Sequence, residues 1–236
     1  SEFVAVENRP KYSNEIFAPK LKSTFLVEFD KMTKESFLIR PFLEQSDETM
    51  ANRSIPYPRG KTLGGSSSIN GLLYIRGQEQ DYNIWRQLGN KGWSWKDVLP
   101  YFLKAENQER GRNEFHGVGG PLSVSDTRIK LDLLEKFMNA AEEKGIPKVD
   151  DFNRGDNFGC GYFQVTEKNG LRCSTAVGYL SPIKNRKNLK IQTNCLVQKI
   201  NFDGTKAISV SFLKNNQLIT VKVDKEIILS AGTIGS

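Results

Sequence analysis

The sequence predicts an α/β fold in which helices and strands are mixed along one chain of 236 residues. Apolar residues recur at helical spacing through the middle of the chain. Segments rich in β-branched residues, which are typical of strands, fill the last third. The run at residues 226–230 is continuous and apolar, a pattern typical of a strand buried on both faces of a parallel sheet. We therefore expect an α+β mixture with at least one parallel strand.

The composition is that of a soluble globular protein, with 38% hydrophobic and 26% charged residues. The net charge of +7 raises the question of a nucleic-acid partner. The densest basic stretch, residues 184–190, contains no interleaved aromatic residue. We interpret it as a solvated turn and expect no nucleic-acid partner. The apolar runs are too short to span a bilayer, so we expect no transmembrane segment.

The three cysteines, Cys160, Cys173 and Cys195, form no Cys-x-x-Cys pair, and the single histidine, His116, is distant in sequence. This spacing excludes a cysteine-rich zinc site, and we predict no metal site. An odd number of cysteines also provides no disulfide framework. The simplest expectation is a reducing, cytoplasmic compartment.

The first part of the chain, residues 1–52, has no sustained hydrophobic period. Residues 25–29 and 36–40 could each form a short strand. No Gly-x-Gly-x-x-Gly turn occurs before residue 53, so we treat residues 1–52 as an atypical N-terminal segment.

Helical signals begin after this segment. Residues 80–88 predict a helix that ends at Gly89. Ser94, followed three residues later by Asp97, predicts the N-terminus of a second helix through a capping box. Pro100 should kink this helix or mark its true start.

The clearest helix is predicted at residues 131–144, before Gly145. Its apolar stripe should face a core and consists of Leu131, Leu134, Phe137, Met138 and Ala141.

Four strands are expected next, at residues 189–193, 197–202, 207–212 and 218–223, with turns at 203–204 and 215–216. Because these strands alternate and the run at 226–230 does not, we expect 226–230 to lie in a different sheet or at its margin.

A glycine- and serine-rich segment at residues 59–71, RGKTLGGSSSING, interrupts this pattern. Glycine lets other atoms approach the backbone closely, and serine adds small donors and acceptors. The segment contains neither a P-loop motif nor Gly-x-Gly-x-x-Gly. From these residues alone it is either a flexible turn or a backbone cradle for phosphates or a flat ring system. If it is a cradle, Gly64, Gly65 and Asn70 should line a cleft.

The longer string at residues 57–82, YPRGKTLGGSSSINGLLYIRGQEQDY, resembles the first signature of the glucose–methanol–choline (GMC) oxidoreductases. Later blocks of the same family resemble four further strings, in the same order: GWSWKDVLPYF, FHGVGGPLSVSD, NGLRCSTAVGYL and EIILSAGTIGS. The resemblance covers about residues 53–236 and is strongest to the choline dehydrogenase-like branch of this FAD-dependent, alcohol-oxidising family.

The resemblance implies part of a Rossmann-like, FAD-binding domain of the GMC type and part of a substrate domain. After the atypical residues 1–52, residues 53–110 would form the FAD-covering loop and helices. Residues 111–188 would belong to the substrate domain, and residues 189–236 would form a β-meander and the return strand of the FAD-binding domain.

The resemblance also implies which residues meet the cofactor. Some family members attach the flavin covalently through a histidine where this chain has Ile69, so we expect non-covalent FAD. The backbone of Val197 would meet the adenine, and the turn at residues 231–232 would lie near the ADP half. The full set of implied cofactor-binding residues is Thr62, Gly64, Gly65, Ser66, Asn70, Gly71, Leu72, Leu73, Val197, Ala231 and Gly232.

The implied activity is oxidation of a primary alcohol, such as choline, to an aldehyde by hydride transfer to the flavin. In this family the catalytic histidine lies far downstream, so we expect no catalytic residue in this chain and interpret His116 as structural. A chain that also lacks the dinucleotide motif should neither hold FAD tightly nor turn over an alcohol by itself. Two alternatives stay open: a truncated, non-catalytic relative kept as a binding module or a remnant, and a lyase on the same scaffold. The sequence does not define the electron acceptor.

Overall fold

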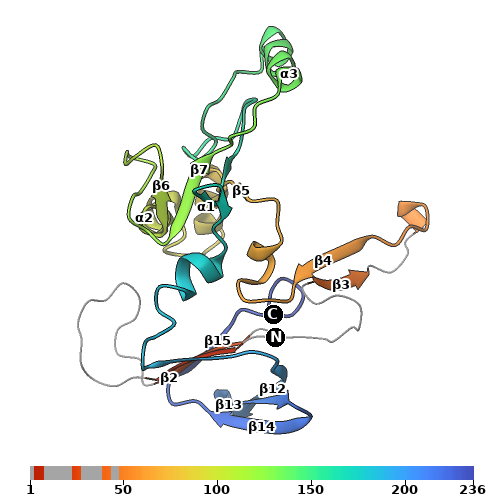
Figure 1. The fold of residues 1–236 in the computed structure, drawn as a ribbon, viewed down its shortest axis with the longest axis vertical. Helices are drawn as coiled ribbons and strands as arrows, with labels where there is room; N and C mark the ends of the chain where they lie inside the picture. Colours follow the sequence, from red (N-terminus) through yellow and green to blue (C-terminus); the bar gives the residue numbers. More distant parts are fainter. Residues whose placement is uncertain (1–2, 8–22, 28–38, 44–47) are drawn as a thin grey trace. The chain divides into compact units, whose positions relative to one another are not determined.

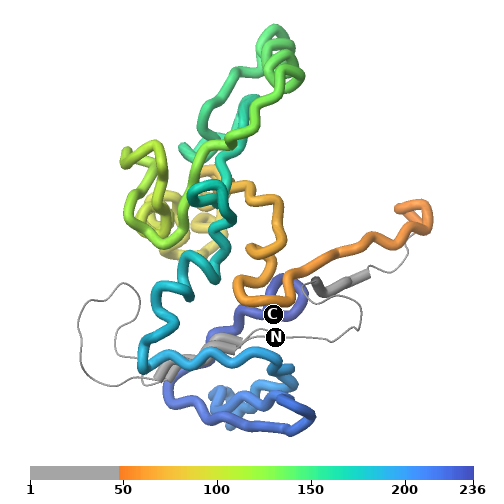
Figure 2. Tube along the Cα trace, in the orientation of Figure 1, coloured from red at the N-terminus to blue at the C-terminus, as the bar shows by residue number. Residues whose placement is uncertain are grey.

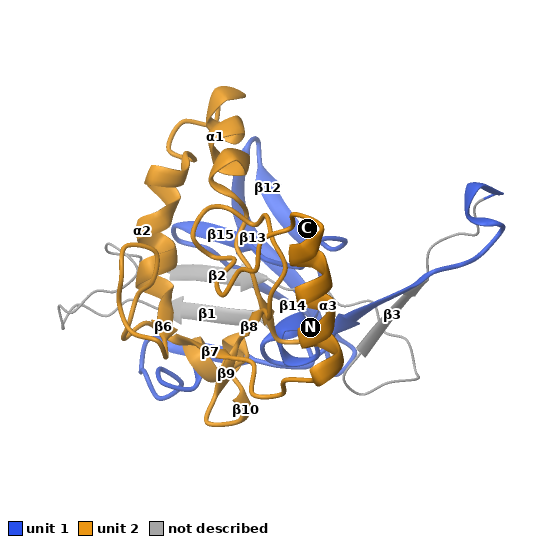
Figure 3. Cartoon of the chain, turned by 90° about the horizontal axis from the view of Figure 1, so that it is seen from above, with its two compact units in different colours: residues 1–69, 180–236 blue, residues 70–179 orange. Residues whose placement is uncertain are grey.

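The computed structural model describes residues 3–7, 23–27, 39–43 and 48–236 (Figures 1 and 2). The chain divides into two compact units, coloured separately in Figure 3. Unit 1 contains residues 1–69 and 180–236, and unit 2 contains residues 70–179. Each unit has its own sheets and is considered by itself below.

A four-stranded sheet in unit 1 has the order β11-β1-β2-β15. Its strands are β11 (Leu189–Gln192), β1 (Phe3–Glu7), β2 (Ser23–Val27) and β15 (Glu226–Leu229). β1 is antiparallel to β11 and β2, whereas β15 is parallel to β2. The parallel pairing predicted for residues 226–230 is therefore confirmed. The strand predicted at 25–29 starts earlier, at Ser23, and residues 28–29 lie outside the described part.

The predicted burial of this last strand on both faces is wrong. Ile228 and Leu229 are exposed, and only Ile227 packs against the neighbouring core. β15 forms the edge of the sheet and pairs with β2 on one side. The continuous apolar run correctly indicated a parallel strand, but the faces of a strand are buried only where other elements cover the sheet, and the run itself does not report such cover.

A second sheet in unit 1 is an antiparallel meander of β12 (Leu196–Asp203), β13 (Lys206–Lys214) and β14 (Gln217–Lys222). Tight turns join these strands, at Gly204 and at Asn215 and Asn216, all with positive φ. The meander encloses a core of Cys195, Val197, Val210 and Phe212. As predicted, β15 lies in a different sheet from these three strands. It shares a sheet with β11, the first of the four predicted strands, and lies at the opposite edge of that sheet.

The remaining elements of unit 1 lie before and within the glycine–serine segment. β3 (Ile39–Leu43) pairs antiparallel with β4 (Pro56–Gly60), and the short 3₁₀ helix η1 (Glu48–Met50) lies between them. β4 leads into a second 3₁₀ helix, η2 (Gly65–Ser68). The strand predicted at residues 36–40 falls mostly outside the described residues, since β3 begins at Ile39.

Two helices near the start of unit 2 each begin with a capping box. α1 (Glu79–Gln87) uses Gln78 and Asp81, and α2 (Trp95–Ala105) uses Ser94 and Asp97. Both helices and the Ser94 capping box were predicted correctly. Pro100 lies inside α2 and does not mark its start. Ring contacts of Tyr82 with Trp95 and Phe102 join the helices, with centroids 5.7 and 5.9 Å away.

The sheet of unit 2 has the order β5-β8-β7-β6. Its strands are β5 (Leu73–Tyr74), β8 (Gln164–Val165), β7 (Leu122–Asp126) and β6 (Glu106–Gln108). β9 (Glu167–Lys168) and β10 (Leu171–Arg172) form a separate hairpin. A π-helical turn, η3 (Ala176–Leu180), follows this hairpin.

The third predicted helix is confirmed as α3 (Asp132–Glu143), but the predicted burial of its stripe is wrong. Met138 is the only buried residue of the helix, whereas Leu131, Leu134 and Phe137 are exposed and Ala141 is half-buried. Helical spacing predicts which residues share a face and does not reveal whether another element covers that face. In the part of the chain that the structure describes, no helix is long and apolar enough to cross a membrane.

The meander core predicts a contrast between two phenylalanines. Phe212 is 1% exposed in that core, whereas Phe202 is 59% exposed on the same sheet. Phe212→Ala should lower the free energy of unfolding by about 3–5 kcal/mol, because it leaves a cavity in a closed core. Phe202→Ala should change it by about 0.5 kcal/mol or less. Urea unfolding of both variants checks this, and equal losses would contradict the assigned core.

Candidate functional site

The glycine–serine segment in unit 1 folds back on the strand that precedes it. The Gly60 amide donates to Ser66 Oγ at 3.1 Å, so η2 lies against the end of β4. A Cβ on Gly60 would lie 2.1 Å from the Gly65 carbonyl oxygen. Gly60 is therefore required because backbone passes directly over it. In this structure the glycine-rich backbone packs against another part of the same segment, Gly60 against Gly65 and Ser66.

The turn itself depends on the next two glycines. Gly64 and Gly65 have φ values of 90° and 51°, in the left-handed region that glycine adopts most easily. The Gly65 amide donates to the Thr62 carbonyl at 2.8 Å. The hydroxyls of Ser67 and Ser68 donate to the carbonyls of Gly64 and Leu63. Thr62, Gly64, Gly65 and Ser66 are thus brought together in one half-buried turn.

The second half of the predicted site, residues 70–73, belongs to unit 2. Asn70 and Gly71 are exposed, and a Cβ on Gly71 would meet no atom within 4 Å. Leu72 has a φ of 68°, which is unfavourable for a bulky side chain by roughly 1–2 kcal/mol. Leu73 opens β5 and pairs with Val165. Strain of this kind persists only where neighbours hold it, and it often marks a functional segment.

The remaining predicted residues lie in unit 1, in two separate environments. Val197 is a buried core residue of the meander, and in the strand ladder it pairs with Phe212 of β13. Ala231 is buried and its amide donates to Ser236 Oγ at 2.9 Å. Gly232 has a φ of 88° and opens the turn that follows β15. The structure therefore places residues 231–232 in the predicted turn.

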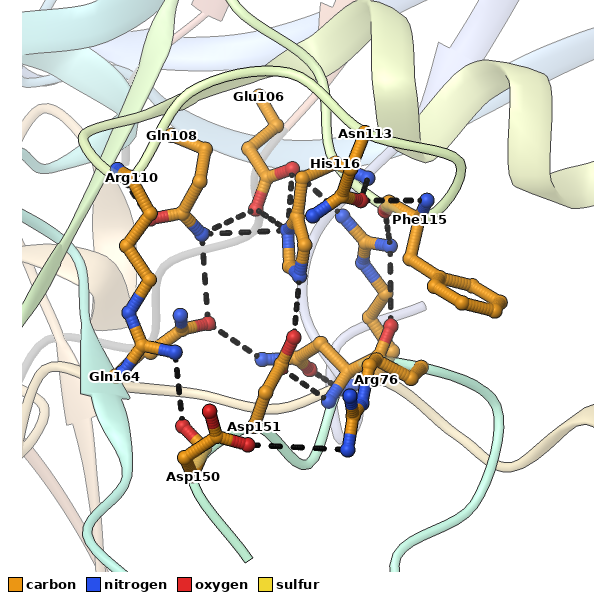
Figure 4. Close-up of polar contacts among 12 residues, drawn as sticks. Arg76, Glu106, Gln108, Arg110, Asn113, Phe115, His116, Asp150, Asp151 and Gln164 are labelled. Carbon is orange, nitrogen blue, oxygen red and sulfur yellow. Dashed lines mark hydrogen bonds and ion pairs between the residues drawn. The ribbon is translucent and has the colours of Figure 1, made fainter.

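Sequence reasoning missed a buried polar network in unit 2 (Figure 4). Glu106, fully buried, accepts from Arg76 Nη2 at 2.9 Å and lies 3.0 Å from His116 Nδ1. His116 Nε2 lies 2.8 Å from Asp151 Oδ2. Asn153 Oδ1 accepts from the Arg76 amide at 2.8 Å. One available signal was Arg76 itself, a charge between the apolar Ile75 and Gly77.

The charges of this network balance only when His116 is protonated. Burial lowers the pKa of His116, but its contacts with Asp151 and Glu106 outweigh burial and raise the pKa to about 9. Burial likewise raises the pKa of the Asp151 carboxyl, and its bond with His116 reverses the direction, so that the net pKa is lowered. At neutral pH two cations, Arg76 and His116, therefore face two anions, Glu106 and Asp151.

His116 is thus enclosed on both ring nitrogens and is 2% exposed. Its loop is fixed by glycine as well, since a Cβ on Gly117 would lie 1.8 Å from the Leu103 carbonyl oxygen. This environment agrees with the interpretation of His116 as a structural residue. Among the described residues, no group of three or more His, Cys, Asp or Glu side chains is arranged to hold a metal ion.

Comparison with known proteins identifies the class to which this chain belongs. Residues 31–236 match the family of the GMC oxidoreductases, and the chain is a member of that family. The match begins at residue 31, whereas the resemblance seen in the sequence begins only at about residue 53. It contains all eleven predicted cofactor residues, from Thr62 to Gly232.

Among curated relatives, the mitochondrial choline dehydrogenase of Mus musculus is 41% identical over 187 residues, which are 79% of this chain and 31% of that protein. The FAD-dependent oxidoreductase from Chaetomium thermophilum has a TM-score of 0.79 at 30% identity, covering 84% of this chain and 37% of its own. Pyridoxine 4-oxidase from Mesorbium loti has a TM-score of 0.77 at 26% identity, covering 84% and 39%. The chain spans about a third of the length of the curated relatives that it matches.

Two glycines of the segment predict opposite outcomes. Gly60→Ala should lower the free energy of unfolding by about 1–3 kcal/mol, because its Cβ overlaps backbone that cannot rotate away. Gly71→Ala should change it by about 0.5 kcal/mol or less, because the space beside Gly71 is open. Urea unfolding of the two variants checks this. A Gly60→Ala variant as stable as Gly71→Ala would show that η2 does not fold against β4.

The His116 network predicts that stability declines in alkaline solution. The pKa of His116 is about 9 in the folded chain and about 6.5 in the unfolded chain. Below the lower value both states hold the proton, and between the two values only the folded state does. The free energy of unfolding should therefore fall by roughly 3 kcal/mol as the pH rises through this window. Because the chain has one histidine, NMR titration of its ring checks the assignment directly, and a midpoint near the unfolded value would contradict it.

Proposed function

We propose that this chain forms the flavin cover, part of the substrate domain and the return strand of an FAD-dependent oxidoreductase that oxidises a primary alcohol to an aldehyde. The observation that carries the proposal is the family match over residues 31–236, which includes every predicted cofactor residue. The names of the relatives support the same class, since they include choline dehydrogenases and an alcohol dehydrogenase [acceptor] of Pseudomonas putida.

The residues of the predicted cover have a chemistry that suits FAD. Gly64 and Gly65 carry no side chains and adopt positive φ, and Gly71 has open space where a Cβ would stand. Asn70 offers an exposed amide, and Leu73 an exposed apolar surface. Flat rings with polar edges are held by such a mixture of apolar contact and a few placed hydrogen bonds. We assign Thr62, Ser66 and Leu72 to the same cover, and the backbone of residues 197 and 231–232 to the ADP half.

When bound, FAD would accept the hydride of the alcohol carbon, and the protein would supply binding, orientation and electrostatics. Residues 70–73, of which all but the half-buried Leu72 are exposed, would cover the cofactor and limit the access of water to it. The base that takes the hydroxyl proton is not His116, because both of its ring nitrogens face carboxylates in a closed network. A general base must reach its proton within hydrogen-bond distance, and His116 is buried.

For the substrate, we propose choline or a related small primary alcohol. The similarity to choline dehydrogenases at 41% identity supports this choice. The electron acceptor stays open, because the relatives include enzymes named as oxygen-dependent and one named for another acceptor.

The proposal predicts that the full-length protein is purified with non-covalent flavin that choline reduces without oxygen. The flavin should be released by denaturation, since Ile69 provides no attachment point. Loss of the visible flavin absorbance upon mixing measures reduction. Deuterium on the carbinol carbon should slow reduction, because that C–H bond breaks in the hydride step.

Ethyltrimethylammonium, which lacks the hydroxyl, is the matched control and should leave the flavin oxidised. Protein without flavin, or flavin that no primary alcohol reduces, would refute the proposal. Cleavage of a substrate without net flavin reduction would instead indicate a lyase.

A further inference from the structure

The hairpin of β9 and β10 brings a distant arginine to the predicted flavin cover. Its two-residue turn is Asn169-Gly170, with φ values of 53° and 76°, a pairing typical of a tight type I′ turn. Across this turn Leu171 pairs with Lys168, and Arg172 is the next residue. Arg172 Nη1 then donates to Asn70 Oδ1 at 2.7 Å, across 102 positions of sequence.

This contact fixes how the amide of Asn70 is oriented. Asn70 Oδ1 accepts a second hydrogen bond from the Leu72 amide at 3.1 Å. An oxygen has two lone pairs, so both are used by these two donors. The two N–H groups on Nδ2 are then the remaining hydrogen-bonding capacity, and they have no protein acceptor among the residues that the structure describes. An arginine donor also determines which end of the amide is oxygen.

The same contacts hold the strained residue of the segment. Leu72, with its φ of 68°, donates its amide to Asn70, and its carbonyl accepts from both the amide and the hydroxyl of Thr166, at 2.8 and 3.2 Å. Thr166 immediately precedes the hairpin that carries Arg172. The hairpin therefore holds the strained segment at two points, and removal of one point should let Leu72 relax.

An ordered donor at an exposed position is typical of a surface that a ligand covers. Asn70 is exposed. Leu73, near Asn70 in sequence, and Leu171, next to Arg172, are exposed apolar residues. In water the ordering of such a segment costs entropy and returns little. With a ligand present, the ordering removes part of the cost of binding.

We propose that Arg172 is a positioning residue of the flavin cover: by holding Asn70 Oδ1 it fixes the backbone of residues 70–72 and leaves the Asn70 N–H groups for an acceptor on the flavin. This inference rests on the proposed function. Arg172 itself acts through Asn70 and does not contact the reacting atoms.

Three variants distinguish the contact between Arg172 and Asn70, here called the clamp, from the N–H donors of Asn70. Arg154→Ala is the control, because Arg154 is an exposed arginine of the same unit whose ion pair with Asp150 is long, at 3.7 Å. Arg172→Ala should raise the rate of flavin release from the full-length protein about tenfold, which is the size expected for a lost charged hydrogen bond. Arg172→Lys should restore part of this loss, since a lysine can still donate to Asn70. Asn70→Asp should keep the clamp, because a carboxylate pairs with Arg172, but should release flavin faster because it has lost the N–H donors.

Two readouts other than turnover test these expectations. Flavin release is followed by the gain of flavin fluorescence, and backbone order by hydrogen exchange of the Leu72 amide in the full-length protein after its flavin has been removed. Arg172→Ala should expose the Leu72 amide to exchange, whereas Asn70→Asp and Arg154→Ala should leave it protected.

The inference is overturned if Arg172→Ala behaves as Arg154→Ala in both readouts, or if Asn70→Asp releases flavin at the wild-type rate. If the wild-type protein holds no flavin, the proposed function fails and the positioning role fails with it. If the wild-type protein holds flavin and the Arg172 and Asn70 variants release it at the wild-type rate, only the positioning role is overturned.

Discussion

The rest of unit 2 depends on the ion pairs that the buried carboxylate of Glu106 makes with Arg76 and His116. Glu106 is 0% exposed, and an unpaired charge at such a position would cost several kcal/mol. Its partners come from separate segments: Arg76 follows β5, and His116 and the Gly117 amide come from the loop before β7. The folded unit can bury this charge only if these segments lie together around it. His116 extends the same constraint to Asp151.

This network also links the interior of unit 2 to its predicted cofactor segment. The Arg76 amide is held by Asn153, and β5 directly joins Arg76 to residues 70–73. Buried ion pairs contribute little net stability compared with a packed apolar core, but a broken pair is strongly destabilising. The network is best understood as a constraint that allows one arrangement of these segments, so that the strained, half-buried Leu72 lies next to a strand whose position is fixed. A binding segment on such a support loses less entropy when a ligand arrives.

Local signals allowed much of the fold to be predicted. The Ser94–Asp97 capping box, the helix before Gly145 and the meander with its turns depend on neighbours within a few residues, and sequence patterns report such neighbours. Burial was predicted poorly. The stripe of α3 and the faces of β15 were expected in a core, and most of both is exposed. Whether a face is covered depends on distant segments, and so do the pairs Arg76–Glu106 and Arg172–Asn70, which span 30 and 102 positions.

In the glycine–serine segment, the motif correctly indicated the family, but its serine hydroxyls make hydrogen bonds within the segment itself. Its serines were expected only to add small donors and acceptors, and in the structure Ser67 and Ser68 donate to carbonyls of their own turn, while Ser66 Oγ accepts from the Gly60 amide. These hydroxyls first hold a left-handed Gly64–Gly65 turn against β4. In the proposed cover, this turn would then meet a ligand chiefly through its backbone. In the proposed cover, recognition through side chains would fall on Asn70, whose Oδ1 accepts a hydrogen bond from Arg172. A segment of this kind tolerates changes at its surface and is sensitive at the glycines and at the residues that orient it.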